Sequence, residues 1–150
     1  MQINVRVNNI NYTEEIDAGE FLIDFLRRIG YKSVKRGCET SSCGACSVLM
    51  NDKLVLSCSV LAAAADQRVI KTLEGLESEI DILGSLIAAE GSDQCGYCTP
   101  GLMMAAIALK KEIPQPTEEE IKVYLAGNLC RCTGYMGQLR AIKKYIEVSE

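Results

Sequence analysis

Histidine is absent from the 150-residue chain. Mixed cysteine-histidine zinc fingers and the histidine-ligated Rieske centre both require that residue, so the sequence excludes both kinds of site. The chain also lacks an apolar run approaching the roughly 18 residues of a membrane span. Its first residues, MQINVRVNN, have no basic segment followed by an apolar one, as a secretory signal would have. We therefore expect a cytoplasmic protein that does not insert into membranes.

Nucleotide-binding motifs are missing as well. No Gly-x-Gly-x-x-Gly sequence opens a helix, and no Walker loop is present. A net charge of −4, with acidic residues spread along the chain, argues against a nucleic-acid-binding surface. We expect protein partners, no nucleic acid, and no turnover of a substrate by this chain alone.

Eight cysteines form two groups of four with different spacing, and none is left over. The groups are Cys38-x4-Cys43-x2-Cys46-x11-Cys58 and Cys95-x2-Cys98-x31-Cys130-x-Cys132. The first spacing, with three cysteines close together and the fourth further along, is that of the plant-type [2Fe-2S] ferredoxins. The pattern thus predicts two four-thiolate sites in a chain that carries electrons.

Clustered cysteines also serve other purposes. A disulfide framework would need an export signal and usually a denser cysteine content than 8 in 150 residues. Structural zinc sites are usually built from two separate pairs of close cysteines, whereas three lie between Cys38 and Cys46. All-thiolate iron-sulfur ligation accounts best for the pattern. A zinc scaffold or a cluster-based redox regulator is the alternative.

Small residues surround the first three cysteines. Gly37 precedes Cys38, and Gly44 follows Cys43. An iron-sulfur cluster carries negative charge, so its loop must bring backbone N–H groups close and keep side chains away. Glycine allows both, and the loop is therefore suited to wrap tightly around a cluster.

Hydrophobic periodicity predicts strands and one helix in the first half of the chain. The expected strands cover residues 3–7, 10–12, 47–50, 54–57 and 69–72. The expected helix, 20–29, has one apolar face made of Phe21, Leu22, Phe25, Leu26 and Ile29. Its position between the first hairpin and the cysteine loop makes residues 1–75 a β-grasp ferredoxin-like domain. The second hairpin would return Cys58 towards the other three cysteines.

Four helices are expected in the second half. Apolar spacing places them around residues 80–87, 101–111, 121–125 and 139–146. Pro100 suits a first helical turn, and Thr117 with Glu120 forms a capping box. The cysteines of this half lie at helix ends, where a helix N-terminus can face an anionic cluster. We predict an α+β chain whose residues 76–150 form a four-helix, [2Fe-2S]-binding domain.

Two further segments identify a family resemblance. Asp93-Gln-Cys-Gly-Tyr-Cys-Thr-Pro-Gly101 and Gly127-Asn-Leu-Cys-Arg-Cys-Thr-Gly-Tyr135, together with the segment from Gly37 to Cys46, resemble the iron-sulfur subunit of the molybdenum hydroxylases, the xanthine dehydrogenase and oxidase family. The resemblance covers essentially the whole chain. It implies a [2Fe-2S] ferredoxin domain followed by a four-helix domain with a second [2Fe-2S] cluster.

The resemblance also implies roles for single residues. Cys38, Cys43, Cys46 and Cys58 would ligate the first cluster. Cys95, Cys98, Cys130 and Cys132 would ligate the second, which lies nearer the molybdopterin. Gln94 would hydrogen-bond the pterin, and Cys132 would touch the pterin edge. Arg131 could offset cluster charge, contact a partner subunit or simply face solvent, and its role stays open.

The assembly implied by the resemblance is an oxidoreductase with several subunits. A large subunit binds molybdopterin with molybdenum, and a medium subunit binds FAD, giving a heterotrimer that can dimerise. Electrons would pass from molybdenum through both clusters to the flavin. Xanthine, hypoxanthine or another aromatic heterocycle is the expected substrate. Carbon monoxide, nicotinate, an aldehyde or an aromatic thioester is the alternative, since residues 39–42 resemble the carbon monoxide dehydrogenase form of the loop.

Overall fold

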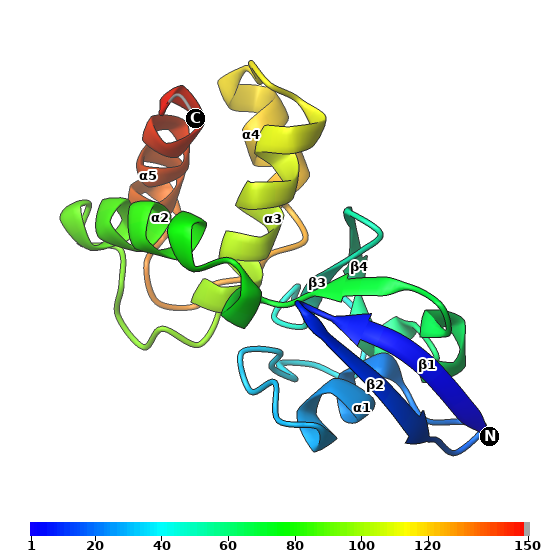
Figure 1. The fold of residues 1–150 in the computed structure, drawn as a ribbon. Coiled ribbons are helices and arrows are strands. Elements are labelled where there is room, and N and C mark those ends of the chain that lie inside the picture. Colours follow the sequence, from blue (N-terminus) through cyan, green and yellow to red (C-terminus); the bar gives the residue numbers. More distant parts are fainter. Residues whose placement is uncertain (149–150) are drawn as a thin grey trace.

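The computed structural model describes residues 1–148 (Figure 1). The first half contains a five-stranded sheet and one α-helix, α1 (Leu22–Arg28). Four α-helices follow it: α2 (Glu77–Ala89), α3 (Thr99–Glu112), α4 (Glu118–Leu125) and α5 (Met136–Glu147). The α+β class predicted from the sequence is confirmed. Residues 149 and 150 of the predicted second domain lie outside the described residues.

The sheet is built from two hairpins joined by a central strand. Its strands are β1 (Gln2–Val7), β2 (Ile10–Glu15), β3 (Ser47–Met50), β4 (Lys53–Leu56) and β5 (Val69–Lys71), in the order β2-β1-β5-β3-β4. Strand β5 runs parallel to β1 and antiparallel to β3. Asn51 and Asp52 have positive φ angles of 49° and 63°, the backbone that a tight two-residue hairpin turn needs.

Helix α1 packs its apolar side into the core of the first half, with Leu22, Ile23, Phe25 and Leu26 buried. Phe21 is an exception to the expected apolar face. It precedes the helix and is 40% exposed, forming a bridge with Leu61 instead of entering the core. Because the helix begins at Leu22, Phe21 does not belong to the buried face of the helix.

Three short 3-10 helices were not predicted: η1 (Ser57–Ser59), η2 (Ala62–Ala65) and η3 (Leu73–Gly75). The first matters for the site, because it contains Cys58. Ser57, expected at the end of a strand, belongs to η1, where its hydroxyl donates to the Cys46 carbonyl at 2.7 Å. The expected domain boundary after residue 75 falls at the end of η3.

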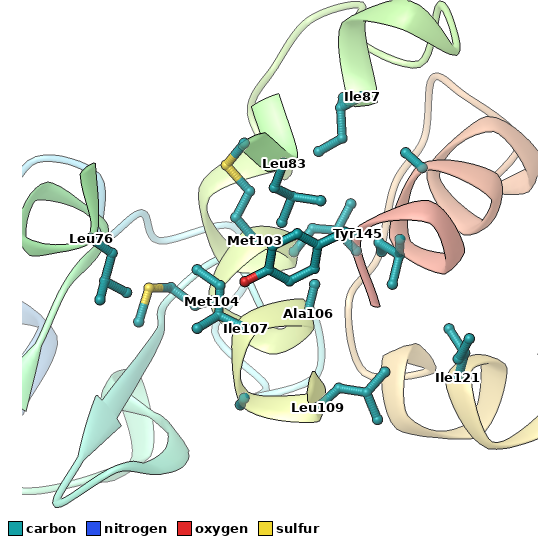
Figure 2. Close-up of a cluster of buried hydrophobic side chains, with 14 of the residues drawn as sticks. Leu76, Leu83, Ile87, Met103, Met104, Ala106, Ile107, Leu109, Ile121 and Tyr145 are labelled. Atoms are coloured by element: carbon teal, nitrogen blue, oxygen red, sulfur yellow. The ribbon is translucent and has the colours of Figure 1, made fainter. Parts of the chain in front are cut away.

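Helix α3 is the centre of the helical half. All its residues from Gly101 to Leu109 are buried. Figure 2 shows Met103 and Ile107 of this helix beside Leu83 of α2 and Tyr145 of α5. The same cluster includes Leu49 of β3, so the helices and the sheet share packing. In residues 1–148, no helix is both long and apolar enough to cross a bilayer.

Candidate iron-sulfur centres

The first cysteine group lies around one small cavity at the edge of the sheet. Cys38 and Cys43 belong to the loop between α1 and β3, Cys46 directly precedes β3, and Cys58 comes from η1. The sulfur atoms lie in two neighbouring pairs, Cys38 beside Cys43 and Cys46 beside Cys58, and each pair affects the pKa of its members. The hairpin of β3 and β4 is what returns Cys58 to Cys46.

Backbone N–H groups point at the sulfur of Cys38. Donors from Ser42, Thr40 and Cys43 lower the pKa of this thiol to about 6, because each stabilises the thiolate. Cys46 is buried, and burial raises its pKa to about 11. A side chain on Gly37 would press on Cys43, since a Cβ there would lie 2.9 Å from the Cys43 sulfur. The close approach expected at this glycine is therefore observed.

The second cysteine group lies where two helices begin. Cys95 and Cys98 directly precede α3, while Cys130 and Cys132 lie in the loop before α5. The Cys132 sulfur is 3.4 Å from that of Cys95, and the Cys98 thiol neighbours that of Cys130. Cys95 and Cys132 are exposed, whereas the other two are half-buried.

Polar groups surround the two half-buried cysteines of this group, Cys98 and Cys130. Burial raises the pKa of Cys98 to about 11. For Cys130, hydrogen bonds from the Thr133 hydroxyl and backbone outweigh burial, lowering the pKa to about 7. The Thr133 hydroxyl lies 3.2 Å from the Cys130 sulfur, and the Cys130 N–H donates to the Tyr135 hydroxyl at 3.0 Å.

The two-plus-two arrangement fits a two-iron cluster. A [2Fe-2S] cluster divides its four thiolates between two irons, as the paired sulfurs of both groups would. The donor set and the N–H groups directed at sulfur therefore suit iron-sulfur clusters.

Both groups open onto one shared cavity of about 450 Å³. It is lined by all four cysteines of the second group and by Cys38 and Cys43 of the first. Three hydrogen bonds join the surrounding loops: the Leu129 N–H donates to the Cys43 carbonyl at 2.9 Å, the Asn128 amide to the Gly44 carbonyl at 3.4 Å, and the Tyr97 hydroxyl to the Arg36 carbonyl at 2.8 Å. The two sites are thus fixed relative to each other.

The two remaining residues singled out from the sequence are exposed. Gln94 is exposed beside Cys95. Arg131 is exposed and lines the shared cavity between Cys130 and Cys132. Sequence reasoning missed Asn128, Tyr97 and Gln138, whose polar groups contact the cysteine loops. Gln138 is a buried amide on a helix, which is unusual, and only the structure shows that it is buried.

An apolar groove of about 320 Å³ lies next to the second group, between α4 and α5. Leu129, Tyr135 and Met136 line it and are 49%, 45% and 55% exposed. Neighbouring exposed apolar side chains of this size are typical of a surface that another protein covers.

Comparisons with known proteins agree with this description. Residues 5–73 match the 2Fe-2S iron-sulfur cluster binding domain, and residues 72–143 match the [2Fe-2S] binding domain. The chain is 41% identical over 148 residues to the nicotinate dehydrogenase small FeS subunit of Eubacterium barkeri, covering 97% of this chain and 94% of that protein. It is 43% identical over 137 residues to the xanthine dehydrogenase iron-sulfur-binding subunit of Escherichia coli, covering 89% of this chain and 86% of that protein.

A solved structure has the same fold. Quinoline 2-oxidoreductase from Pseudomonas putida 86 superposes with a TM-score of 0.90 at 33% identity, covering 97% of this chain and 93% of that one. With two [2Fe-2S]-binding domains and relatives matched over nearly their full length, the chain belongs to the iron-sulfur subunits of the molybdenum hydroxylase family.

Proposed function

We propose that this chain is the electron-transfer subunit of a molybdenum hydroxylase, with one [2Fe-2S] cluster at each cysteine group. Cys38, Cys43, Cys46 and Cys58 would hold the first cluster, and Cys95, Cys98, Cys130 and Cys132 the second. Residues 1–75 would be a β-grasp ferredoxin-like domain, and residues 76–150 a four-helix domain. The strand and helix order is consistent with that division. Such clusters accept and release single electrons.

The shared cavity is the observation that carries the proposal. Six of the eight cysteines line it, so no protein layer separates the two groups there. Gly44 and Gly101 allow this, because a Cβ on Gly101 would collide with the backbone of Gly44 and Ala45. The chain's own contribution is to hold two sites at a fixed short separation and to direct N–H groups at their sulfurs.

The exposed side of the second group is suited to the molybdopterin-binding large subunit. Cys95 and Cys132 are exposed, and Gln94 is exposed next to Cys95, so its amide would be available to a pterin. The apolar groove of Leu129, Tyr135 and Met136 is adjacent and would be covered by the same subunit. Docking there would bring the cofactor to the second group before the first.

The first group would face the FAD-binding subunit. Phe21 and Leu61 form an exposed apolar pair close in sequence to Cys58 and α1, at 40% and 44% exposure. Burial of this pair by a partner would favour contact near the first cluster. With one partner subunit at each surface, the assembly would be a heterotrimer that can dimerise, and electrons would pass from molybdenum through the second cluster and then the first to the flavin.

The substrate of the assembled enzyme would be an aromatic nitrogen heterocycle, with xanthine and hypoxanthine as leading candidates. Relatives named for nicotinate, xanthine and quinoline all act on that class. An aldehyde is the second candidate, since the iron-sulfur-binding subunit PaoA of an Escherichia coli aldehyde oxidoreductase is 35% identical to this chain.

Metal analysis tests the proposal directly. We would purify the chain with its partners and without chelators, measure iron and sulfide, and record EPR spectra after dithionite reduction. About four irons per chain, two for each cluster, and two distinguishable S = 1/2 signals are expected. Zinc without an EPR signal would refute the electron-transfer function and support a structural scaffold.

A further inference from the structure

Gln138 is a buried amide placed against a cysteine of the second group. It lies in the first turn of α5, is 3% exposed, and its Nε2 is 3.7 Å from the sulfur of Cys98. Glutamine is mostly found at protein surfaces, and a buried amide costs free energy unless its polar atoms are hydrogen-bonded. Its position therefore points to an interaction that the fold maintains.

The start of α5 determines where Gln138 points. Tyr135 has a positive φ of 70°, which turns the chain sharply before the helix. Gly137 then packs against the segment before the second cysteine group, since a Cβ there would lie 2.8 Å from the Ser92 Cβ. Ser92 is itself buried, and its hydroxyl donates to the Ile87 carbonyl at 3.0 Å. The close packing of Gly137 on Ser92 therefore holds the start of the helix, and with it Gln138, in place.

The chemistry of the contact follows from its two partners. A metal-bound cysteine is a thiolate, which can only accept hydrogen bonds, so the amide nitrogen of Gln138 must be the donor. The amide is neutral and keeps its protons over the whole working pH range. Hydrogen bonds to cluster sulfurs are among the factors that set the reduction potential. A donor stabilises the more negative, reduced state more than the oxidised state.

The side-chain donors of this group are unevenly distributed. Cys98 receives the Gln138 amide, and the neighbouring Cys130 has the Thr133 hydroxyl at 3.2 Å. Cys95 and Cys132 are exposed to solvent and contact each other. Near the first group, the hydroxyls of Ser41 and Ser42 approach sulfur, but both residues are exposed. Gln138 is 3% exposed, so its hydrogen bond is better sheltered from competing water than the contacts of the two serines.

We propose that Gln138 is a positioning residue that raises the reduction potential of the second cluster through its N–H···S hydrogen bond to Cys98. This inference rests on the proposed function, because it requires a cluster at the second group. The Gln138 amide would help set a reduction potential at which the second cluster can accept an electron from the partner subunit's cofactor and still pass it to the first cluster.

The test is an EPR-monitored redox titration of the assembled enzyme carrying Gln138→Met. Methionine is unbranched and of similar length, but it has no N–H. At a fixed applied potential, the reduced-to-oxidised ratio of the second cluster should fall on the order of tenfold, which corresponds to about 59 mV for one electron. The first cluster should keep its potential. Gln138→Leu provides a second donor-free variant and should shift the second cluster in the same direction.

Leu139→Ala is the matched control. Leu139 is the next residue of α5 and is 7% exposed, so its truncation disturbs the packing of the same helix turn without removing a donor to sulfur. It should lower the melting temperature and leave both potentials unchanged. An unchanged second-cluster potential in both Gln138 variants, or an equal shift in Leu139→Ala, would overturn the inference. Absence of a second cluster signal from the wild-type enzyme would overturn the proposed function, and the inference with it.

Discussion

The backbone N–H of Leu129 donates a hydrogen bond to the carbonyl oxygen of Cys43 at 2.9 Å. Cys43 belongs to the first cysteine group, and Leu129 directly precedes Cys130 of the second. A single backbone hydrogen bond therefore links Cys43 of the first group to the residue that precedes Cys130 of the second group. Since no side chain makes this contact, its geometry depends on how closely the two loops approach.

Gly44 is the residue that permits this approach. It has a φ of 71°, and a Cβ there would collide with the Gly127 carbonyl and the Asn128 side chain. We expect Gly44→Ala to separate the two loops. It should lower the stability by more than the roughly 1–2 kcal/mol that left-handed backbone alone costs a residue with a Cβ. Thermal unfolding would measure the loss, and EPR spectra should show both cluster signals altered.

Gly91→Ala is a control for the backbone cost. Gly91 has a similar φ of 61°, but a Cβ there would meet no atom within 4 Å. The substitution should cost about 1–2 kcal/mol and leave both cluster signals unchanged. Equal effects of the two substitutions would mean that the contact between the loops does not depend on Gly44.

Cys132→Ser tests the assignment of the second group. Serine keeps the shape of the side chain but replaces the thiolate, which iron prefers as a ligand, with a hydroxyl. We expect the second EPR signal to disappear while the first remains and the sheet half stays folded. Cys38→Ser should have the reciprocal effect on the first signal. Retention of both signals in either variant would contradict the ligand assignment.

Gln94→Ala tests the contact with the pterin. Gln94 is exposed beside Cys95, so its loss should leave the fold and both clusters intact. One neutral hydrogen bond contributes about 1 kcal/mol, and we therefore expect turnover of the assembled enzyme to fall by less than about tenfold. Gln115→Ala, at another exposed glutamine in the loop between α3 and α4, should have no effect. Unchanged turnover and unchanged cofactor retention in Gln94→Ala would exclude a pterin role.

Local patterns in the sequence predicted much of the fold. The strands and helices fall within a few residues of their expected positions, because periodicity of apolar residues reports directly on which face is buried. The capping box is also confirmed: the Glu120 N–H donates to the Thr117 hydroxyl and the Thr117 N–H to the Glu120 carboxylate. The spacing of the cysteines predicted two groups, and the four of each group lie around one cavity. Their role as ligands stays a prediction.

Contacts between distant segments could not be predicted in the same way. The shared cavity depends on Gly44 meeting Gly127 and Gly101, residues more than fifty positions away in the chain, and no local pattern records such a meeting. Gln138 could not be singled out from the sequence, because only the tertiary packing of α5 brings its amide to the sulfur of Cys98. Phe21 was wrongly expected in the core, since the helix begins two residues later than expected and Phe21 lies outside it.

The ion pairs of Glu118 make the packing of α4 on α5 dependent on pH. Its carboxylate contacts Lys122 at 2.8 Å and Lys143 of α5 at 2.7 Å, and hydrogen bonds with these two lysines lower its pKa from 4.5 to about 2. Because the pKa is lower in the folded state, the stabilisation is fully present above about pH 4.5 and is lost as the pH falls towards 2.

Glu118→Gln should therefore lower the melting temperature slightly at pH 7, and the difference from wild type should shrink below pH 4.5. Glu119→Gln removes a charge from the same helix turn but leaves both lysine contacts of Glu118 in place. An equal, pH-dependent loss in both variants would assign the effect to the helix end rather than to the ion pairs.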